Sequence, residues 1–163
     1  MAEIDSKSLH EMFEYRDGLL LWKTDRARRK AKAGDEASHL NKTGYKYTCF
    51  NYKQYRTHRL IYCMFHGFMP EYIDHIDGDK LNNKIENLRA CTKAQNSYNR
   101  KAPKTNSSGH KNVCFYKRYN KWRSYIDVHG KKITGGYFDT IEDAVISATN
   151  LRQQHHGEFA NHG

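Results

Sequence analysis

The chain has few of the features that mark secreted, membrane-spanning and disordered proteins. It contains two prolines in 163 residues and no apolar run that approaches the roughly 20 residues of a membrane helix. Its four cysteines are widely separated and form no C-x-x-C pair, which argues against a zinc knuckle and against a disulfide framework. The start of the chain is acidic and has no apolar signal segment, so we expect a cytoplasmic protein without a membrane partner.

The chain is rich in basic and aromatic residues. Lys and Arg number 28 against 18 Asp and Glu, which gives a formal net charge of +10. Aromatic residues make up 13% of the chain and include 12 tyrosines, enough to build folded cores. A basic protein that folds favours polyanions as partners, with nucleic acid first among them.

The charge falls into three segments that predict two domains. Residues 1–99 have a net charge of +4, residues 100–106 of +3, and residues 107–163 of +3. The middle segment combines basic charge with Pro103 and leads into a Ser-Ser-Gly run, a composition typical of a linker. We therefore predict a first domain over residues 1–99, a basic linker over 100–106 and a second domain over 107–163.

Hydrophobic periodicity in the first domain predicts a mixture of helices and strands. Residues 6–15 place apolar side chains at helical spacing, and residues 19–22 form an apolar run typical of a buried strand. Residues 45–50 and 53–57 predict a hairpin, and residues 58–66 predict a helix that packs onto it. These elements place the domain in the α+β class.

A dense basic run follows the predicted strand at residues 19–22. Residues 23–32, here called the basic arm, contain six basic side chains and one acidic one. A solvated loop would explain such a run, but no other block of the chain is as dense. We predict that it contacts DNA phosphates together with the linker. The predicted contacts are Arg26, Arg28, Arg29, Lys30 and Lys32 in the arm, and Arg100, Lys101 and Lys104 in the linker.

The second domain is predicted to contain three strands and one helix. Residues 113–116, 122–128 and 132–138 read as strands that turn residues separate. A Thr-Ile-Glu-Asp sequence beginning at residue 140 signals the start of a helix, and Gly157 signals its end. Since the apolar side chains of this helix keep to one face, we expect a three-stranded antiparallel sheet packed on one helix.

Alternation along the middle strand assigns its side chains to two faces of this sheet. Trp122, Ser124 and Ile126 share the face that the helix would cover. The other face would be polar, aromatic and basic, as a sheet that reads a DNA groove requires. The residues predicted to bind DNA there are Lys111, Tyr116, Arg123, Tyr125, Lys132 and Thr134.

The densest group of possible metal ligands lies within residues 72–96, and three interpretations compete for it. A calcium loop fails, because Gly78 is not preceded by ligands at the required alternate positions. A solvated turn explains the central Asp-Gly-Asp sequence. A nuclease site would use the hard oxygens of Asp74 and Asn96 for one Mg²⁺ or similar ion, with His75 taking a proton from water. The residue types alone leave the last two interpretations open.

The order and intervals of these motifs resemble the HNH endonuclease family of the homing type. The matching residues are His58-Arg59-Leu60, Asp74-His75, Asn87-Leu88-Arg89 and Asn96. The resemblance spans the predicted first domain and implies a ββα-metal (His-Me finger) fold that binds one divalent cation, Mg²⁺ or Mn²⁺. By position, it implies that His75 is the general base, that Asp74 is a metal ligand and that Asn87 holds His75 and its loop in place.

Two positions need separate comment within this resemblance. The third motif position is Asn96 instead of histidine, an H-N-N variant of the family that still suits metal binding and affects mainly the choice of ion. His58 is interpreted as a structural histidine, with a phosphate-facing role as the alternative.

The second domain resembles the Apetala-two DNA-binding domain of plant ethylene-response factors, which is also appended to phage HNH endonucleases. The matching stretches are residues 108–113, 121–123, 136–140 and 156–161. The resemblance implies a three-stranded sheet that lies in the major groove. Several base-contacting arginine positions of that family are Cys114, Tyr116 and Asp127 in this chain, so we do not expect the plant target sequence.

These inferences predict a site-preferring DNA endonuclease of the homing or nicking type. It would hydrolyse phosphodiester bonds in double-stranded DNA with one divalent ion, in the cytoplasm of an infected bacterium if phage-encoded. One active site per chain predicts a nick, and a double-strand break would need sequential nicks or a homodimer on DNA. The alternative is a DNA-binding regulator with an idle nuclease site, which a plasmid nicking assay would distinguish.

Overall fold

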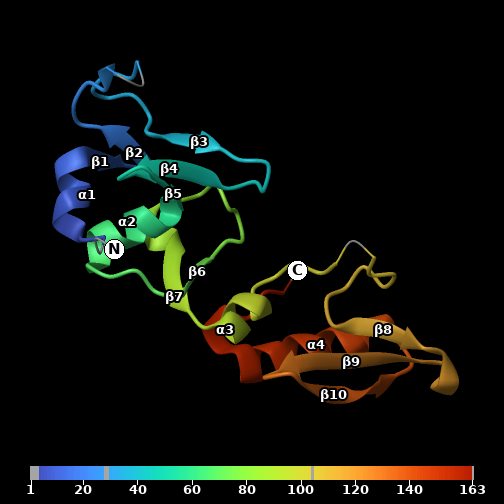
Figure 1. Ribbon diagram of the computed structural model, residues 1–163. Coiled ribbons are helices and arrows are strands. Elements are labelled where there is room, and N and C mark those ends of the chain that lie inside the picture. The colour runs from blue at the N-terminus through green and yellow to red at the C-terminus, as the bar shows by residue number, and fades with distance from the viewer. Residues whose placement is uncertain (1–3, 28–29, 104, 163) are drawn as a thin grey trace. The chain divides into compact units, whose positions relative to one another are not determined.

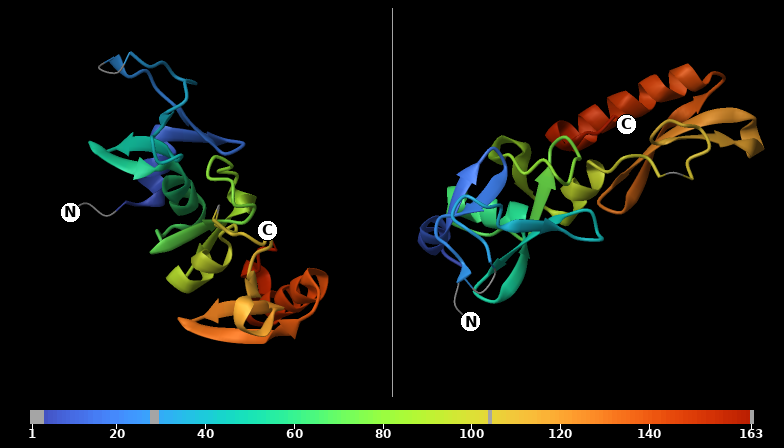
Figure 2. Two further views of the ribbon diagram at one scale, coloured as in Figure 1. Left: turned by 90° about the vertical axis from the view of Figure 1, so that its right-hand side faces the viewer. Right: turned by 90° about the horizontal axis from the view of Figure 1, so that it is seen from above.

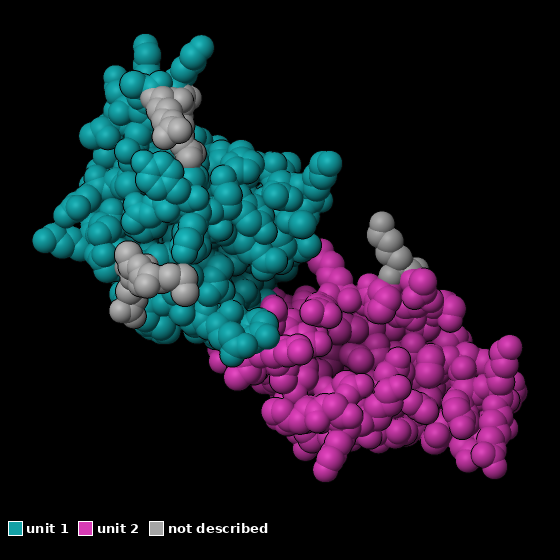
Figure 3. Space-filling model, viewed as in Figure 1, with its two compact units in different colours: residues 1–91 teal, residues 92–163 magenta. Residues whose placement is uncertain are grey.

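The computed structural model describes residues 4–27, 30–103 and 105–162 of the chain (Figure 1). The chain divides into two compact units, residues 1–91 and residues 92–163 (Figure 3). Both consist of helices and small antiparallel sheets, so the α+β class predicted from the sequence is confirmed. Among the described residues, no helix is long and apolar enough to cross a membrane.

The first unit begins with helix α1 (Ser6–Met12), followed by the hairpin of β1 (Phe13–Arg16) and β2 (Leu19–Trp22). The predicted helix, residues 6–15, is too long. The observed helix ends three residues earlier, at Met12, and the residues predicted as its last turn belong to strand β1. The reason is the turn between the strands, where Asp17 and Gly18 have φ of 47° and 83°. Asp-Gly with positive φ is the favoured two-residue hairpin turn, and it pairs Phe13 with Trp22.

A second sheet and a helix follow. Strands β3 (Ser38–Leu40), β4 (Lys46–Phe50) and β5 (Lys53–Arg56) pair in that order, and α2 (Thr57–His66) starts where β5 ends. The predicted hairpin and the predicted helix after it are both confirmed.

The third sheet of the unit carries Asp74 and His75 on one strand and Arg89 on the other. Strands β6 (Tyr72–His75) and β7 (Leu88–Cys91) are antiparallel, and a loop over residues 76–84 and a short 3-10 turn (Ile85–Asn87) connect them. This strand pair and α2 pack on one hydrophobic core, which fixes the motif residues against the helix. The buried apolar residues of the core are Leu9, Phe13, Leu20, Trp22, Ala37, Phe50, Leu60, Ile61, Tyr62, Cys63, Met64, Ile73 and Leu88.

The second unit contains the predicted three-stranded sheet and its helix. Strands β8 (Val113–Tyr116), β9 (Lys121–Val128) and β10 (Lys131–Phe138) are ordered β10-β9-β8, and α4 (Ile141–His156) lies along one face of the sheet (Figure 2). Bounds, turns and order agree with the prediction.

Helix α4 covers the predicted face of this sheet. Ser124 on β9 and Ser147 on α4 share a hydrogen bond of 2.8 Å between their hydroxyls, and Ile126 is fully buried. The helix begins where Thr140 accepts a hydrogen bond from the backbone N–H of Asp143, the cap expected from the sequence. Among the described residues of this unit, no helix or strand covers the opposite face. We call it the open face; it carries Tyr116, Arg123, Tyr125, Lys132 and Thr134.

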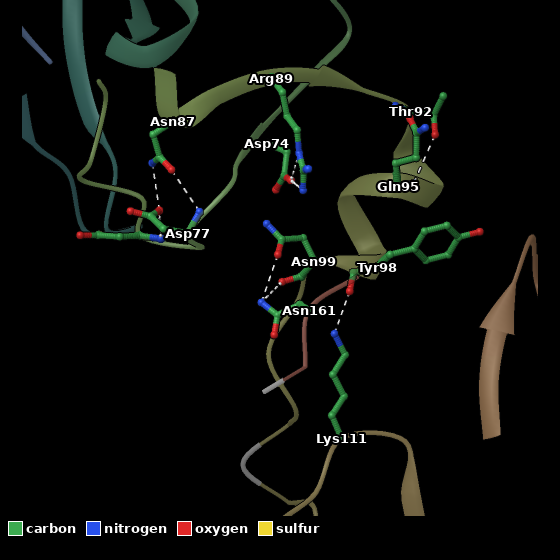
Figure 4. Close-up of polar contacts among 11 residues, drawn as sticks. Asp74, Asp77, Asn87, Arg89, Thr92, Gln95, Tyr98, Asn99, Lys111 and Asn161 are labelled. Carbon is green, nitrogen blue, oxygen red and sulfur yellow. Dashed lines mark hydrogen bonds and ion pairs between the residues drawn. The ribbon is translucent and has the colours of Figure 1, made fainter. Parts of the chain in front are cut away.

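The short helix α3 (Lys93–Tyr98) belongs to the second unit. A reciprocal capping box between Thr92 and Gln95 starts it (Figure 4). Its last residue, Tyr98, stacks on His156 of α4 with ring centroids 3.8 Å apart. The contacts therefore divide the chain before α3, whereas the sequence-based prediction divided it after α3.

Candidate active site

Asp74 is held by an arginine that the hairpin places opposite it. The register of β6 and β7 pairs Asp74 with Arg89. Both Nε and Nη2 of Arg89 donate to Asp74 Oδ2, at 3.0 and 2.8 Å (Figure 4). The side chain of Asp74 is 6% exposed and that of Arg89 is 15% exposed, so the guanidinium compensates the charge of a buried carboxylate. Arg89 lies within a motif that carries the family resemblance, but no role was predicted for it from the sequence.

His75 is buried next to Asp74 and is oriented by an asparagine. Its Nε2 lies 3.1 Å from Oδ1 of Asn83, which is itself 2% exposed. Because an amide oxygen only accepts, Nε2 carries the proton and the lone pair of the neutral ring is on Nδ1. His75 can therefore accept a proton through Nδ1 while Asn83 fixes the orientation of the ring.

The loop that carries Asn83 is tied together by Asn87. The side-chain amide of Asn87 donates to Oδ1 of Asp77 at 2.9 Å and to the backbone oxygen of Asn82 at 2.8 Å. Its Oδ1 accepts from the backbone N–H of Asp77 at 3.1 Å (Figure 4). A buried amide that makes three bonds holds both ends of the loop in one conformation.

Asp77 is the acceptor at the centre of this network. Burial acts to raise the pKa of its carboxyl, but hydrogen bonds from Asn82, Asp79 and Asn87 outweigh burial and lower it. A lowered carboxyl pKa means that the ionised form stabilises the fold, so this stabilisation is lost as the pH falls through the folded-state pKa. The turn is therefore ordered by hydrogen bonds among its own residues, and solvation alone does not describe it.

A tyrosine and a second histidine surround His75. The ring centroids of His58 and His75 are 4.8 Å apart in an edge-to-face arrangement, and those of Tyr45 and His58 are 5.6 Å apart. Two cations lie over the Tyr45 ring, with Arg56 Cζ at 4.4 Å and Lys80 Nζ at 4.8 Å from its centroid. No role was predicted for Tyr45, Arg56 or Lys80, because they come from separate segments of the chain and only the fold brings them together.

The β1–β2 hairpin contacts the loop that carries Asn83. Tyr15 accepts a hydrogen bond at its hydroxyl from the backbone N–H of Ile85, at 3.1 Å. Gly18 lies directly against the loop, since a Cβ atom there would be 2.8 Å from the backbone nitrogen of Lys84 and 2.9 Å from the carbonyl carbon of Asn83. The Asp-Gly turn and the orientation of His75 are therefore coupled through Asn83.

Replacing Gly18 with alanine is expected to destabilise the first unit and to move the loop. The positive φ costs about 1 kcal/mol and the clash with backbone a further 1–3 kcal/mol or so. Chemical denaturation measures the loss. Gly67→Ala is the matched control, because Gly67 has φ of 77° but nothing within 4 Å of its Cβ position. Equal losses for the two variants would contradict the close contact.

The residues present fit a divalent cation of the Mg²⁺ type at Asp74. Such an ion uses one or two carboxylates, and water and phosphate oxygens complete its shell. Among the described residues, no group of three or more His, Cys, Asp or Glu side chains is placed to hold a metal. The proposed second ligand, Asn96, lies half-buried on α3 in the second unit, so its pairing with Asp74 stays a prediction.

The basic arm is described only in part. Arg26 stacks on Trp22, with its Cζ 4.6 Å from the ring centroid, and forms an isolated bridge with Ala31. Lys30 and Lys32 are exposed. Their exposure leaves them accessible, and their contact with DNA phosphates stays a prediction. Arg100 and Lys101 of the linker are also exposed, whereas Arg28, Arg29 and Lys104 lie outside the described residues.

The open face carries a ladder of alternating aromatic and cationic side chains. Arg123 lies over Tyr125 at 4.9 Å and over Tyr116 at 5.7 Å, and Lys132 lies over Tyr125 at 5.5 Å. Lys132 and Thr134 on β10 are exposed. Five of the six residues predicted for this face therefore occupy β8, β9 and β10, with the cations held over rings.

The sixth, Lys111, is a correction. It precedes β8, and its Nζ donates to the backbone oxygen of Tyr98 at 2.7 Å (Figure 4). Burial, and then the charge of Arg152, lowers the pKa of Lys111 to about 8. A half-buried amine that binds the end of α3 does not lie on the sheet face, and alternation along β8 could not predict this because Lys111 is outside the strand.

Comparison with known proteins gives matches over both units. Residues 55–98 match the family model described as HNH endonuclease, a stretch that runs from β5 to α3. Protein 3.8 of Escherichia phage T7 is 37% identical over 111 residues, which cover 67% of this chain and 91% of that protein. An uncharacterised HNH endonuclease of Acanthamoeba polyphaga mimivirus is 31% identical over 125 residues, or 75% of this chain and 64% of that protein. No solved structure gives a significant match.

Proposed function

We propose that the chain, whose residues 55–98 match the HNH endonuclease model, is a site-preferring DNA endonuclease that hydrolyses phosphodiester bonds in double-stranded DNA. The observation that carries this proposal is the buried pair Asp74 and His75 at the end of β6, with His75 oriented by Asn83. A buried, oriented imidazole beside a carboxylate is the arrangement that general-base chemistry on a metal-held phosphate needs.

His75 acts as the general base in the proposed mechanism. Its Nδ1 takes a proton from the attacking water, and the bond between Nε2 and Asn83 keeps the ring in the required tautomer. Asn87 maintains the loop in which Asn83 sits. A divalent ion, held by Asp74 and Asn96 when bound, would stabilise charge on the phosphate and the leaving oxygen. Arg89 orients the carboxylate of Asp74 for that role.

The open face is proposed to hold the protein on DNA. Its cations are held over tyrosine rings, so they are pre-positioned and lose less side-chain freedom on binding. The basic arm and the linker would add contacts to the backbone. We propose single-strand nicking as the product of one chain, with a double-strand break from sequential nicks or from a homodimer on DNA, in the cytoplasm of an infected bacterial cell.

A nicking assay tests the proposed function. Supercoiled plasmid that carries a cognate region should be converted to open circles with Mg²⁺ or Mn²⁺ and should stay intact when EDTA is added. Cutting that persists in EDTA would contradict the metal-dependent mechanism. A protein that binds DNA but never cuts it would instead favour the regulator with an idle nuclease site.

The role of the open face gives a second expected result. Lys132→Ala should weaken DNA binding and lower the slope of log affinity against log salt by about one, because one phosphate contact is lost. Lys131→Ala is the matched control, since neighbouring residues of a strand point to opposite faces. Fluorescence anisotropy at several salt concentrations measures both slopes. Equal slopes for the two variants would exclude the open face as the DNA surface.

A further inference from the structure

His58 is a buried histidine that makes no hydrogen bond to another described residue. Its side chain is 3% exposed and lies at the start of α2. Within the described parts of the chain, neither ring nitrogen of His58 makes a hydrogen bond. His10, by contrast, places Nε2 3.0 Å from the backbone oxygen of Met64. The ring nitrogens of His58 are not among the fully buried polar atoms without a partner in the described residues, so a group from outside the chain can reach them.

A buried polar atom without a partner in the described part of the chain lies on Asn83, next to His75. Nδ2 of Asn83 is buried and has no hydrogen-bond partner among the described residues, while Oδ1 of the same amide binds His75. His58 contacts His75 through its ring, at 4.8 Å between centroids. A buried donor without a partner next to the candidate base is what a site built for a polar ligand would show.

The surroundings of His58 favour an anion as that ligand. Arg56 and Lys80 place two positive charges over Tyr45, whose ring is the next neighbour of His58. Helix α2 begins at Thr57, and no side chain among the described residues caps its first turn. The hydroxyl of Thr57 is instead engaged with that of Thr48 at 2.9 Å. Free N–H groups and the helix dipole make such an end attractive to phosphate.

The histidine is neutral at ordinary pH. Burial, followed by the charges of His75, Arg56 and Arg59, lowers the pKa of His58 to about 3. A neutral imidazole has one N–H donor and one acceptor nitrogen, so it offers a hydrogen bond without a charge. It therefore differs from His75 in what it can do, since proton uptake is unfavourable for it.

We propose that His58 is a second catalytic histidine, whose ring N–H donates to a non-bridging oxygen of the phosphate that is cleaved next to His75. This inference rests on the proposed nuclease function. Charge accumulates on those oxygens in the transition state, so a donor fixed in a dry site binds the transition state more strongly than the substrate. His58 is then part of the reaction site, in place of the structural role that the sequence suggested.

Two kinds of replacement separate this role from a structural one. His58→Phe keeps a ring against His75 and Tyr45 but removes both nitrogens. His58→Asn and His58→Gln remove the ring but keep an N–H donor near the position of Nδ1 or Nε2. A purely structural residue tolerates phenylalanine best, whereas a hydrogen-bond donor to phosphate tolerates one of the amides best.

The experiment measures single-turnover nicking, DNA affinity in EDTA and thermal unfolding for the full-length variants. We expect His58→Phe to nick about 100-fold more slowly with an unchanged or higher Tm and unchanged DNA affinity. The better amide should retain more activity than phenylalanine despite a lower Tm. The control is His66→Phe on the same helix, where the ring stacks on Tyr62 at 4.1 Å, and it should nick like the wild type.

Several outcomes would overturn the inference. A His58→Phe variant that nicks at the wild-type rate would overturn it. So would nicking rates that fall in the same order as the Tm values of the variants. A wild-type protein that does not nick with Mg²⁺ or Mn²⁺ overturns the proposed function and this inference together. A wild type that nicks beside an equally active His58→Phe overturns the inference alone.

Discussion

Replacing His75 with alanine is expected to slow plasmid nicking by about 100- to 10,000-fold, the contribution of a positioned general base. DNA affinity should stay within a few-fold of the wild type, because the predicted binding surfaces lie elsewhere. The side chain is 6% exposed and interacts with Asn83 and the ring of His58, so its loss removes the proton acceptor and a packed ring together. Single-turnover nicking and fluorescence anisotropy measure the two effects.

Two variants accompany this experiment. Asn83→Ala leaves the imidazole in place but removes the acceptor at 3.1 Å from Nε2, so it should produce a smaller loss of rate than His75→Ala. His66→Ala, on the exposed side of α2, should leave the rate unchanged. If His75→Ala retains cutting, another group is the base and the proposed role of His75 is wrong.

Replacing Asn87 with alanine is expected to lower the free energy of unfolding of the first unit by roughly 2–3 kcal/mol, because buried groups are left without partners. The amide makes three hydrogen bonds, to the side chain and backbone of Asp77 and to the backbone of Asn82. Nicking should fall by about 10- to 100-fold, because the loop that carries Asn83 loses the hydrogen bonds that Asn87 makes to it. Urea denaturation and the nicking assay measure both effects.

Asn87→Asp makes this prediction specific to the hydrogen bonds. The aspartate has nearly the same shape but places a carboxylate where the amide nitrogen now donates to Asp77 Oδ1 at 2.9 Å. Two carboxylates this close repel, so at neutral pH this variant should be less stable than Asn87→Ala. As the pH falls into the carboxyl range, the pair can share a proton and the difference should shrink. Equal stability of both variants at every pH would contradict the network.

Asn82→Ala is the graded control for the same loop. It removes the bond from its side-chain amide to Asp77 Oδ2, at 2.7 Å, and the longer bond of 3.4 Å that its Oδ1 accepts from the backbone N–H of Lys84. It keeps the backbone oxygen that accepts from Asn87. Its side chain is half-buried, so we expect a loss of about 1 kcal/mol and a small change in the nicking rate.

The elements that the sequence predicted correctly are those with strong local signals. Helix α2, the β4–β5 hairpin and the strands and helix of the second unit follow from periodicity, turn residues and caps within short windows. The N-terminal helix was predicted too long, because its apolar spacing continues into Phe13, while the Asp-Gly turn that makes Phe13 a strand residue lies beyond the helix.

The motif residues could be found in the sequence, but their partners could not. Asp74 and His75 are adjacent in the chain, and their position on a strand follows from the pattern around them. Arg89 faces Asp74 only because a long loop closes the β6–β7 hairpin in one register, and such a loop has no short turn signal. Lys111 is a residue type that commonly contacts DNA, yet its Nζ donates a hydrogen bond to the backbone at the end of α3.

The sequence by itself determined the α+β class, most of the secondary structure around each motif and the residue types proposed to carry the chemistry. The tertiary structure decided which side chains surround His75. Tyr45, His58 and Asn83 belong to three segments that are separate in the sequence, and the packing of these segments brings them together around His75. Local patterns encode local structure, whereas the partners of a buried side chain depend on how distant segments pack.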